Sequence, residues 1–169
     1  LPVYRLFLPA MNTSTSSQPL FPPGISQILA MEPQGQQLEV QGWLRTRRDS
    51  GGLLFLELND GSCLENLQIM VENSIEGWND LHKQLSTGAA VQVLGSLEPS
   101  PAKGQRLELR ASSIRVLGEA DSGSYPLQKK RHSFEFLRSI SHLRPRTNAL
   151  GAVARIRNTL NFAIHRFFQ

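Results

Sequence analysis

The 169-residue sequence predicts a mainly β fold: a small barrel of five strands followed by a basic segment and amphipathic helices. Short runs of alternating apolar and polar residues fill the region from Leu38 to Leu117, as in strands with one buried face. Turn-forming clusters, Ser50-Gly51-Gly52 and Asn59-Asp60-Gly61-Ser62, separate the first three runs. A long stretch with helical spacing of apolar residues begins only after Ser133, so the strands precede the main helical part of the chain.

The stretch from Gln41 to Val71 predicts a three-stranded antiparallel meander, whose side chains alternate between two faces. The predicted inner face is aliphatic and consists of Leu38, Val40, Leu44, Leu54, Leu56, Leu58, Leu67, Ile69 and Val71. The predicted outer face is mixed and consists of Trp43, Arg45, Arg47, Phe55, Glu57, Gln68 and Met70. The same alternation puts Arg48 on the inner side, so Arg48 needs a strand end or a bulge to reach the outer face. Aromatic, basic and amide side chains on one sheet face are typical of proteins that bind single-stranded nucleic acid.

Two more strands are predicted at Ala90–Leu97 and Arg106–Leu117, after a short helix at residues 76–84. Five strands with a helix between the third and the fourth give the element order of an OB-fold barrel. An SH3-like barrel is the structural alternative, but it lacks that helix. We therefore expect an OB-fold domain at residues 36–118.

The segments on either side differ from the barrel in composition. Residues 1–35 are rich in Ser, Thr and Pro and predict a flexible leader, or alternatively a plastid or mitochondrial targeting remnant. Residues 119–148 form a basic hinge that includes a short helix opened by Ser133. Residues 149–169 predict a long amphipathic helix, with no stop signal before the last residue. We expect this helix to be the first helix of a larger domain.

Charge is distributed unevenly along the chain. Residues 1–128 hold nine Lys or Arg and thirteen Asp or Glu, a net charge of 9 − 13 = −4, whereas residues 129–169 hold nine and one, a net of +8. This asymmetry indicates a polyanionic partner near the C-terminal part. The single cysteine, Cys63, excludes an intramolecular disulfide, and the four histidines have no metal-ligand spacing. No run is long and apolar enough to predict a membrane-spanning helix.

Several motifs resemble bacterial asparaginyl-tRNA synthetase, a class II enzyme, from about Leu38 to Gln169: GWLRTRRDSGG, NDGS, Leu67-Gln68, YPLQKKRHSFEFLR and HLRPRTN. Aspartyl- and lysyl-tRNA synthetases share the first motif, and the segment KRHSFEFLR with HLRPRTN favours the asparaginyl family. The resemblance implies a homodimeric, cytoplasmic ligase that joins asparagine to its tRNA through an adenylate, using ATP and magnesium. The dimer would form through the region of residues 149–169. The catalytic arginine motifs of class II enzymes do not follow in this sequence, so the chain alone is expected to be inactive and to hold no cofactor.

The resemblance also implies roles for individual residues on the outer face. Phe55 would stack on an anticodon base, Gln68 would read a base edge, and Glu108 would lie beside the anticodon. The residue types themselves predict that Arg45, Arg48 and Arg47 neutralise phosphates, with Trp43 as a further aromatic of the RNA-binding face. No catalytic or metal-binding residue is expected. The alternatives are a free-standing OB-fold protein that binds single-stranded nucleic acid, or the anticodon domain of an aspartyl-tRNA synthetase.

Overall fold

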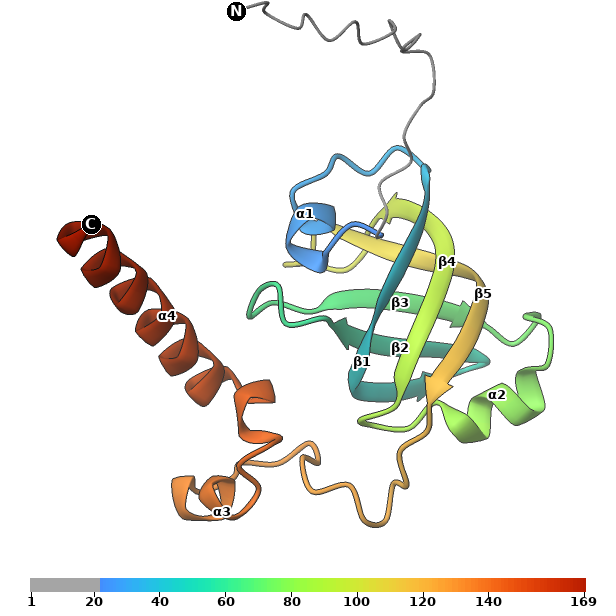
Figure 1. Ribbon diagram of the computed structural model, residues 1–169. Helices are drawn as coiled ribbons and strands as arrows, with labels where there is room; N and C mark the ends of the chain where they lie inside the picture. Colours follow the sequence, from blue (N-terminus) through green and yellow to red (C-terminus); the bar gives the residue numbers. More distant parts are fainter. Residues whose placement is uncertain (1–21) are drawn as a thin grey trace, which may run out of the picture.

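A computed structural model describes residues 22–169 and places five strands in a closed barrel (Figure 1). The strands are β1 (Gln37–Ser50), β2 (Leu53–Asn59), β3 (Leu67–Glu72), β4 (Ala90–Pro99) and β5 (Leu107–Gly118). Around the barrel their order is β1-β2-β3-β5-β4, and only the pair of β3 with β5 is parallel. A helix, α2 (Trp78–Gln84), lies between β3 and β4 in the chain. The predicted five-stranded fold is confirmed.

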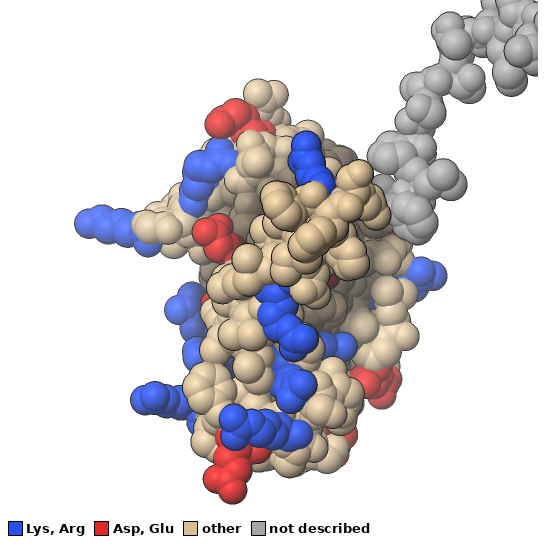
Figure 2. Space-filling view, turned by 60° about the vertical axis from the view of Figure 1, so that its left-hand side comes forward, with Lys and Arg blue, Asp and Glu red and all other residues tan. Residues whose placement is uncertain are grey.

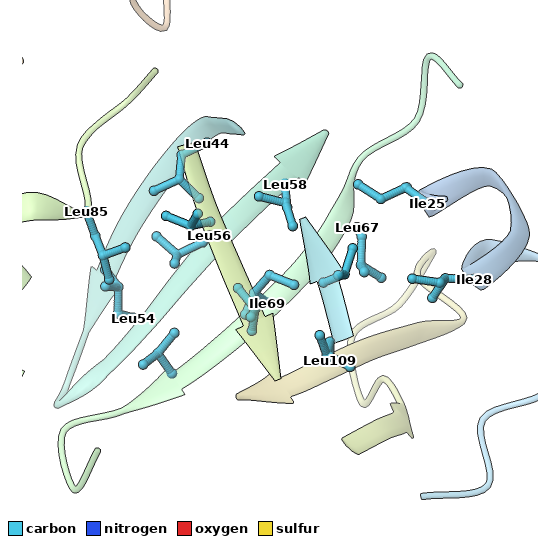
Figure 3. Packing of buried hydrophobic residues seen from close by; sticks show 14 of the residues in the cluster. Ile25, Ile28, Leu44, Leu54, Leu56, Leu58, Leu67, Ile69, Leu85 and Leu109 are labelled. Carbon is cyan, nitrogen blue, oxygen red and sulfur yellow. The ribbon is translucent and has the colours of Figure 1, made fainter. Parts of the chain in front are cut away.

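The barrel interior holds the aliphatic side chains that alternation assigned to the inner face (Figure 3). Leu54, Leu56, Leu67 and Ile69 have no exposed surface, and Leu38 is only partly buried. Burying one such side chain contributes about 1.5–3 kcal/mol, so β2 and β3 are held mainly by this interior. The outer side chains of the same strands are left free for other contacts.

β1 contains a bulge at Arg45, and this bulge changes which side chains share the outer face. Leu44 pairs with Leu58 and Thr46 pairs with Glu57, so two residues of β1 advance against one residue of β2. An extra residue reverses the alternation beyond it. The prediction that Arg47 faces outward is therefore wrong, since Arg47 lies opposite the buried Leu56. The bulge that Arg48 needs to reach the outer face is present, and Arg48 lies opposite Phe55.

Helix α1 (Ile25–Leu29) closes one end of the barrel, with Ile25 and Ile28 fully buried beside Leu58 and Leu67 (Figure 3). Polar contacts fix the helix as well. Asp60 Oδ2 accepts from the Ile25 N–H at 2.8 Å, and Arg106 donates to the carbonyl oxygen of Leu29 at 2.6 Å. The prediction of a flexible leader at residues 1–35 is thus wrong for α1, because this helix packs on the barrel core. Residues 1–21 and the targeting alternative based on them lie outside the described residues.

Helix α2 packs near the other end of the barrel and is attached to β1 by Arg47. The Arg47 guanidinium donates to the carbonyl oxygens of His82 at 2.6 Å and Leu85 at 3.1 Å, and it pairs with Asp49 at 3.0 Å. The last carbonyl groups of a helix have no partner within the helix, so a cation at this place satisfies them. Arg47 therefore has a structural partner on the side of β1 away from Phe55.

Beyond the barrel the chain forms α3 (Phe134–Ser139), a 3₁₀ turn η1 (Arg144–Arg146) and the long helix α4 (Asn148–Phe168). Ser133 caps α3, because its Oγ accepts from the Phe136 N–H at 3.1 Å. α4 projects away from the barrel, and its apolar residues Ile156, Leu160 and Phe167 are exposed (Figure 1). Among residues 22–169, no helix is both long enough and apolar enough to span a membrane.

Candidate nucleic-acid interface

The outer surface formed by β1, β2, β3 and β5 carries two parallel rows of side chains that run across the strands. Pairing of the strands defines both rows. The first row, called the stacking row, consists of Arg48, Phe55, Met70 and Arg110. The second row, called the amide row, consists of Thr46, Glu57, Gln68 and Glu108. The rows bring together Phe55, Gln68 and Glu108, three residues that the sequence singled out.

The stacking row combines a flat apolar surface with positive charge. The Arg48 guanidinium carbon lies 4.9 Å from the centre of the Phe55 ring, within the range of a cation–π contact. Arg48 is exposed and Phe55 is partly exposed. At the far end of the row Arg110 forms an ion pair with Glu72 of β3. A base that stacks on Phe55 would thus meet a cation beside it.

The amide row contains two carboxylates, Glu57 and Glu108, that accept hydrogen bonds. Gln68 Nε2 donates to Glu108 Oε2 at 3.1 Å, and Ser100 Oγ donates to the same oxygen at 3.0 Å. Glu108 is only 6% exposed. On the other side of Gln68, the exposed Glu57 accepts from Asn66 Nδ2 at 3.1 Å. Gln68 therefore lies between two carboxylates. Their negative charge would repel a phosphate group at this place.

Trp43 and Arg45 contact the hinge instead of standing free on the outer face. The Arg146 guanidinium carbon lies 4.4 Å from the centre of the Trp43 ring. Arg45 donates to the carbonyl oxygen of Arg146 and to Asn148 Oδ1 at 3.3 Å. Burial lowers the pKa of Arg45 below its usual value, because the charged form loses hydration. A phosphate contact from Arg45 would require these bonds to open.

Tyr125 adds a second contact between the hinge and the barrel, and no pattern in the sequence indicated it. Gly88 has φ +95°, and a Cβ there would lie 2.6 Å from the Tyr125 ring, so the glycine makes room for the aromatic ring. The Tyr125 hydroxyl accepts from Arg146 Nη1 at 3.2 Å. Arg155 of α4 donates to the carbonyl oxygen of Gly61. The hinge and the start of α4 are thus held against the barrel by side chains of both.

A groove of about 1140 Å³ lies between the barrel and the hinge. Thr46 and Glu57 of the amide row line one side, and the basic run Lys129–Arg131 lines the other. Figure 2 shows a face of the molecule on which Lys and Arg side chains outnumber Asp and Glu. The groove therefore connects the outer face to the part of the chain with the most positive charge. In the described part of the chain no group of three His, Cys, Asp or Glu side chains could hold a metal ion.

Residues 38–117, which include nearly all of the barrel, match the family model of OB-fold nucleic acid binding domains. Over 145 residues the chain is 55% identical to asparagine–tRNA ligase of Desulfotalea psychrophila and 57% identical to that of Synechocystis. These alignments cover 86% of this chain and 32% and 31% of the two relatives. The chain therefore spans about a third of the length of the curated relatives that it matches.

The fold is also similar to a solved structure, asparaginyl-tRNA synthetase from Pyrococcus horikoshii complexed with asparaginyl-adenylate. The TM-score is 0.73 at 20% identity, and the match covers 88% of this chain and 34% of that chain. At this identity the likeness concerns the fold alone. The two sequence relatives show separately that the chain is similar in sequence to about a third of an asparagine–tRNA ligase. The resemblance inferred from the motifs is confirmed.

Proposed function

We propose that this chain is the tRNA-binding part of an asparagine–tRNA ligase, and that the stacking row and the amide row bind the anticodon loop. The observation that carries this proposal is the placement of Phe55, Gln68 and Glu108 on neighbouring strands of one outer surface. The groove lined by Lys129–Arg131 opens beside that surface. The names of the sequence relatives support asparagine as the amino acid.

Each part of the surface has a distinct task in this proposal. Phe55 offers a flat face to an unstacked base, a contact that contributes about 1–3 kcal/mol and tolerates every base. Gln68 supplies the edge contact that distinguishes one base from another. Arg48 and the hinge residues neutralise phosphates, which position the loop without reading it. Arg47 has no part in it, because its guanidinium is bonded to the end of α2.

The rest of the proposed reaction belongs to the ligase as a whole. It would join asparagine to tRNA through an asparaginyl-adenylate, with ATP and magnesium, during translation in the cytoplasm. We further propose that the exposed apolar side of α4 takes part in a homodimer, since Ile156 and Leu160 are more than half exposed. We expect the 169-residue polypeptide to bind tRNA without activating asparagine.

The proposal is tested by the affinity of the chain for two RNA stem-loops at one fixed salt concentration. One loop carries an asparagine anticodon, whose central base is uridine because asparagine codons begin with two adenosines. The other loop has cytidine at that place. Phe55→Ala should weaken binding to both loops by about 1–3 kcal/mol, since a stacked base is lost. Gln68→Ala should reduce mainly the preference for uridine, by up to about 1–3 kcal/mol.

Gln41→Ala provides a matched control, because Gln41 is an exposed glutamine of β1 whose side chain, within residues 22–169, donates only to Glu39. It should leave both affinities unchanged. A wild-type chain that binds the two loops equally would contradict anticodon reading. That result would instead favour the alternative of a single-strand binder that stacks bases and neutralises phosphates without selecting a sequence.

A further inference from the structure

We propose that Glu108 is a positioning residue for base recognition: it holds the Gln68 amide so that only the carbonyl oxygen of that amide is offered to RNA. This inference rests on the proposed function and specifies the chemistry of the same surface. It assigns to Glu108 an action through Gln68, and it assigns to Gln68 the role of a hydrogen-bond acceptor. The base that it selects must present an N–H donor.

The orientation of the Gln68 amide follows from elementary hydrogen-bond chemistry. A glutamine side chain has one end that donates and one end that accepts, and the two ends have nearly the same shape. A carboxylate can only accept, so the end of Gln68 that faces Glu108 must be the NH₂ group. The structure has this arrangement, with Nε2 of Gln68 at 3.1 Å from Oε2 of Glu108. Oε1 of Gln68 is left for a partner from outside.

Glu108 is itself held in place, so it can fix its neighbour. It is only 6% exposed, and Ser100 Oγ donates to the same Oε2 at 3.0 Å. Ser100 lies directly after β4, whose last residues pair with the start of β5. Two donors, one on β3 and one directly after β4, therefore converge on one carboxylate oxygen. Turning the Gln68 amide around would place its carbonyl oxygen against this carboxylate and would cost a hydrogen bond to a charged group.

The neighbours of Gln68 favour the same kind of base. Glu57 stands on the other side of Gln68 and is also a carboxylate, so the amide row presents acceptors along its length. Within residues 22–169 no group donates a hydrogen bond to Gln68 Oε1. At N3 uracil has an N–H donor, whereas cytosine has an acceptor there and carries its donor on the exocyclic N4. Where Gln68 Oε1 contacts N3 of the base, it should therefore prefer a uridine, in keeping with the central base of an asparagine anticodon.

Two substitutions of Glu108 separate the orienting bond from mere packing. Glu108→Gln keeps an oxygen that accepts from both Gln68 and Ser100, whereas Glu108→Met keeps the length of the side chain and removes the acceptor. The readout is the ratio of affinities for the uridine and cytidine loops, measured at one salt concentration. We expect a ratio of about five to ten in the wild type and in Glu108→Gln, and a ratio near one in Glu108→Met. A change in overall stability alone would lower both affinities and leave this ratio unchanged.

The possible results distinguish the inference from the function on which it rests. A wild-type ratio of one would overturn the proposed function. A wild-type ratio of five to ten that persists in Glu108→Met would overturn the role of Glu108 and leave anticodon reading intact. Glu108→Gln retains the acceptor. If its ratio of affinities nevertheless falls as far as that of Glu108→Met, the role of Glu108 would also be overturned.

A measurement on the wild-type chain keeps the inference testable if Glu108→Met does not fold. The central uridine of the loop is replaced by 3-methyluridine, which lacks the N3–H, or by 5-methyluridine, which retains it and carries the same extra methyl group. The loop with 3-methyluridine should bind about five- to tenfold more weakly than the uridine loop, and the loop with 5-methyluridine about equally to it. Equal affinity for the two methylated loops would show that Gln68 does not accept from N3–H.

Discussion

At the scale of single residues, Arg47 and Arg48 are adjacent in the sequence but contact different parts of the structure. Arg47 donates to carbonyl oxygens at the end of α2, and its side chain is only 22% exposed. Arg48 is exposed and lies over the Phe55 ring. The bulge at Arg45 produces this difference, because it reverses the alternation of side chains along the last part of β1. One of the two arginines serves the fold, and the other is exposed on the stacking row.

Arg48→Ala should weaken binding to all stem-loops to a similar extent. It should also lower the slope of log affinity against log salt concentration by about one, because one phosphate contact is lost. Arg47→Ala should instead lower the free energy of unfolding by about 1–3 kcal/mol, since the carbonyl groups at the end of α2 lose a charged donor. Salt titrations of RNA binding and denaturant unfolding measure the two effects. Arg115→Ala is the matched control, because Arg115 is an exposed arginine on the part of β5 that pairs with β4.

An unchanged salt slope in Arg48→Ala would remove Arg48 from the phosphate contacts. A slope that falls equally in Arg115→Ala would show that the overall charge matters and the location on the stacking row does not. Either result would leave the cation–π contact with Phe55 as a feature of the fold alone.

The places where sequence patterns failed have a common physical cause. Alternation located Phe55 and Gln68 correctly, because each lies in a short regular strand where every second side chain faces outward. It failed at Arg47, and it put Arg48 on the outer face only on condition of a bulge, because a bulge depends on how β1 pairs with β2 and leaves no mark in the sequence. Tyr125 and Arg146 were missed for the same reason: their partners lie far away in the chain, at Gly88 and Trp43. Tertiary contacts of this kind have no local periodicity.

At the scale of whole elements, α1 shows how a short helix becomes part of the barrel. The segment that contains α1 is rich in Pro and uncharged residues, which suggested a flexible leader. Ile25 and Ile28 are nevertheless as buried as any strand residue. A five-residue helix is too short to be stable alone. Packing against the core and the hydrogen bonds from its N–H groups to Asp60 and Ser62 supply what the helix lacks.

The attachment of α1 should depend on pH through Asp60. Burial alone would raise the pKa of Asp60, but hydrogen bonds from the Ser62 hydroxyl and the Ile25 N–H outweigh burial and lower that pKa below its usual value. A lowered carboxyl pKa stabilises the fold above the unfolded value of about 3.9, and this contribution is lost as pH falls through the lower folded value. Asp60→Asn, which does not titrate, should therefore be less stable than the wild type at neutral pH, and the difference should shrink below about pH 4.

Denaturant unfolding of both proteins between pH 7 and pH 2 measures this difference in free energy. Asp80→Asn is a matched control, because it removes an exposed carboxylate from α2. A difference between wild type and Asp60→Asn that stays constant over the whole pH range would contradict the proposed link. It would mean that the carboxamide disturbs α1 for a reason unrelated to charge.

At the scale of the whole molecule, charge and shape divide the chain into two parts with different tasks. Residues 1–128 carry a net charge of −4 and include the barrel, whose amide row holds the carboxylates of Glu57 and Glu108. Residues 129–169 carry +8 and form the hinge and α4. A polyanion is attracted by the second part and repelled by the carboxylates of the first. This division should bring the RNA backbone to the hinge and leave the barrel to contact bases.

Replacing Lys129, Lys130 and Arg131 together with glutamine tests this division of tasks. The net charge of residues 129–169 falls from +8 to 8 − 3 = +5. Because single-stranded RNA contributes about 0.7 to the salt slope per neutralised phosphate, the slope of log affinity against log salt should fall by about two. The ratio of affinities for the uridine and cytidine loops should stay as in the wild type, since phosphate contacts carry no sequence information.

A second triple variant provides the matched control for this experiment. It replaces Arg138, Arg157 and Arg166 with glutamine, and these exposed residues of α3 and α4 give the same change in net charge outside the run Lys129–Arg131. If the hinge contacts the RNA backbone, the control should lower the salt slope much less than the hinge variant, because its charges act only through the general field and are screened beyond about 8 Å at physiological salt. Equal slopes in the two variants would show that Lys129–Arg131 make no specific contact with the RNA backbone. A uridine preference that disappears in the hinge variant would contradict the separation of backbone binding from base reading.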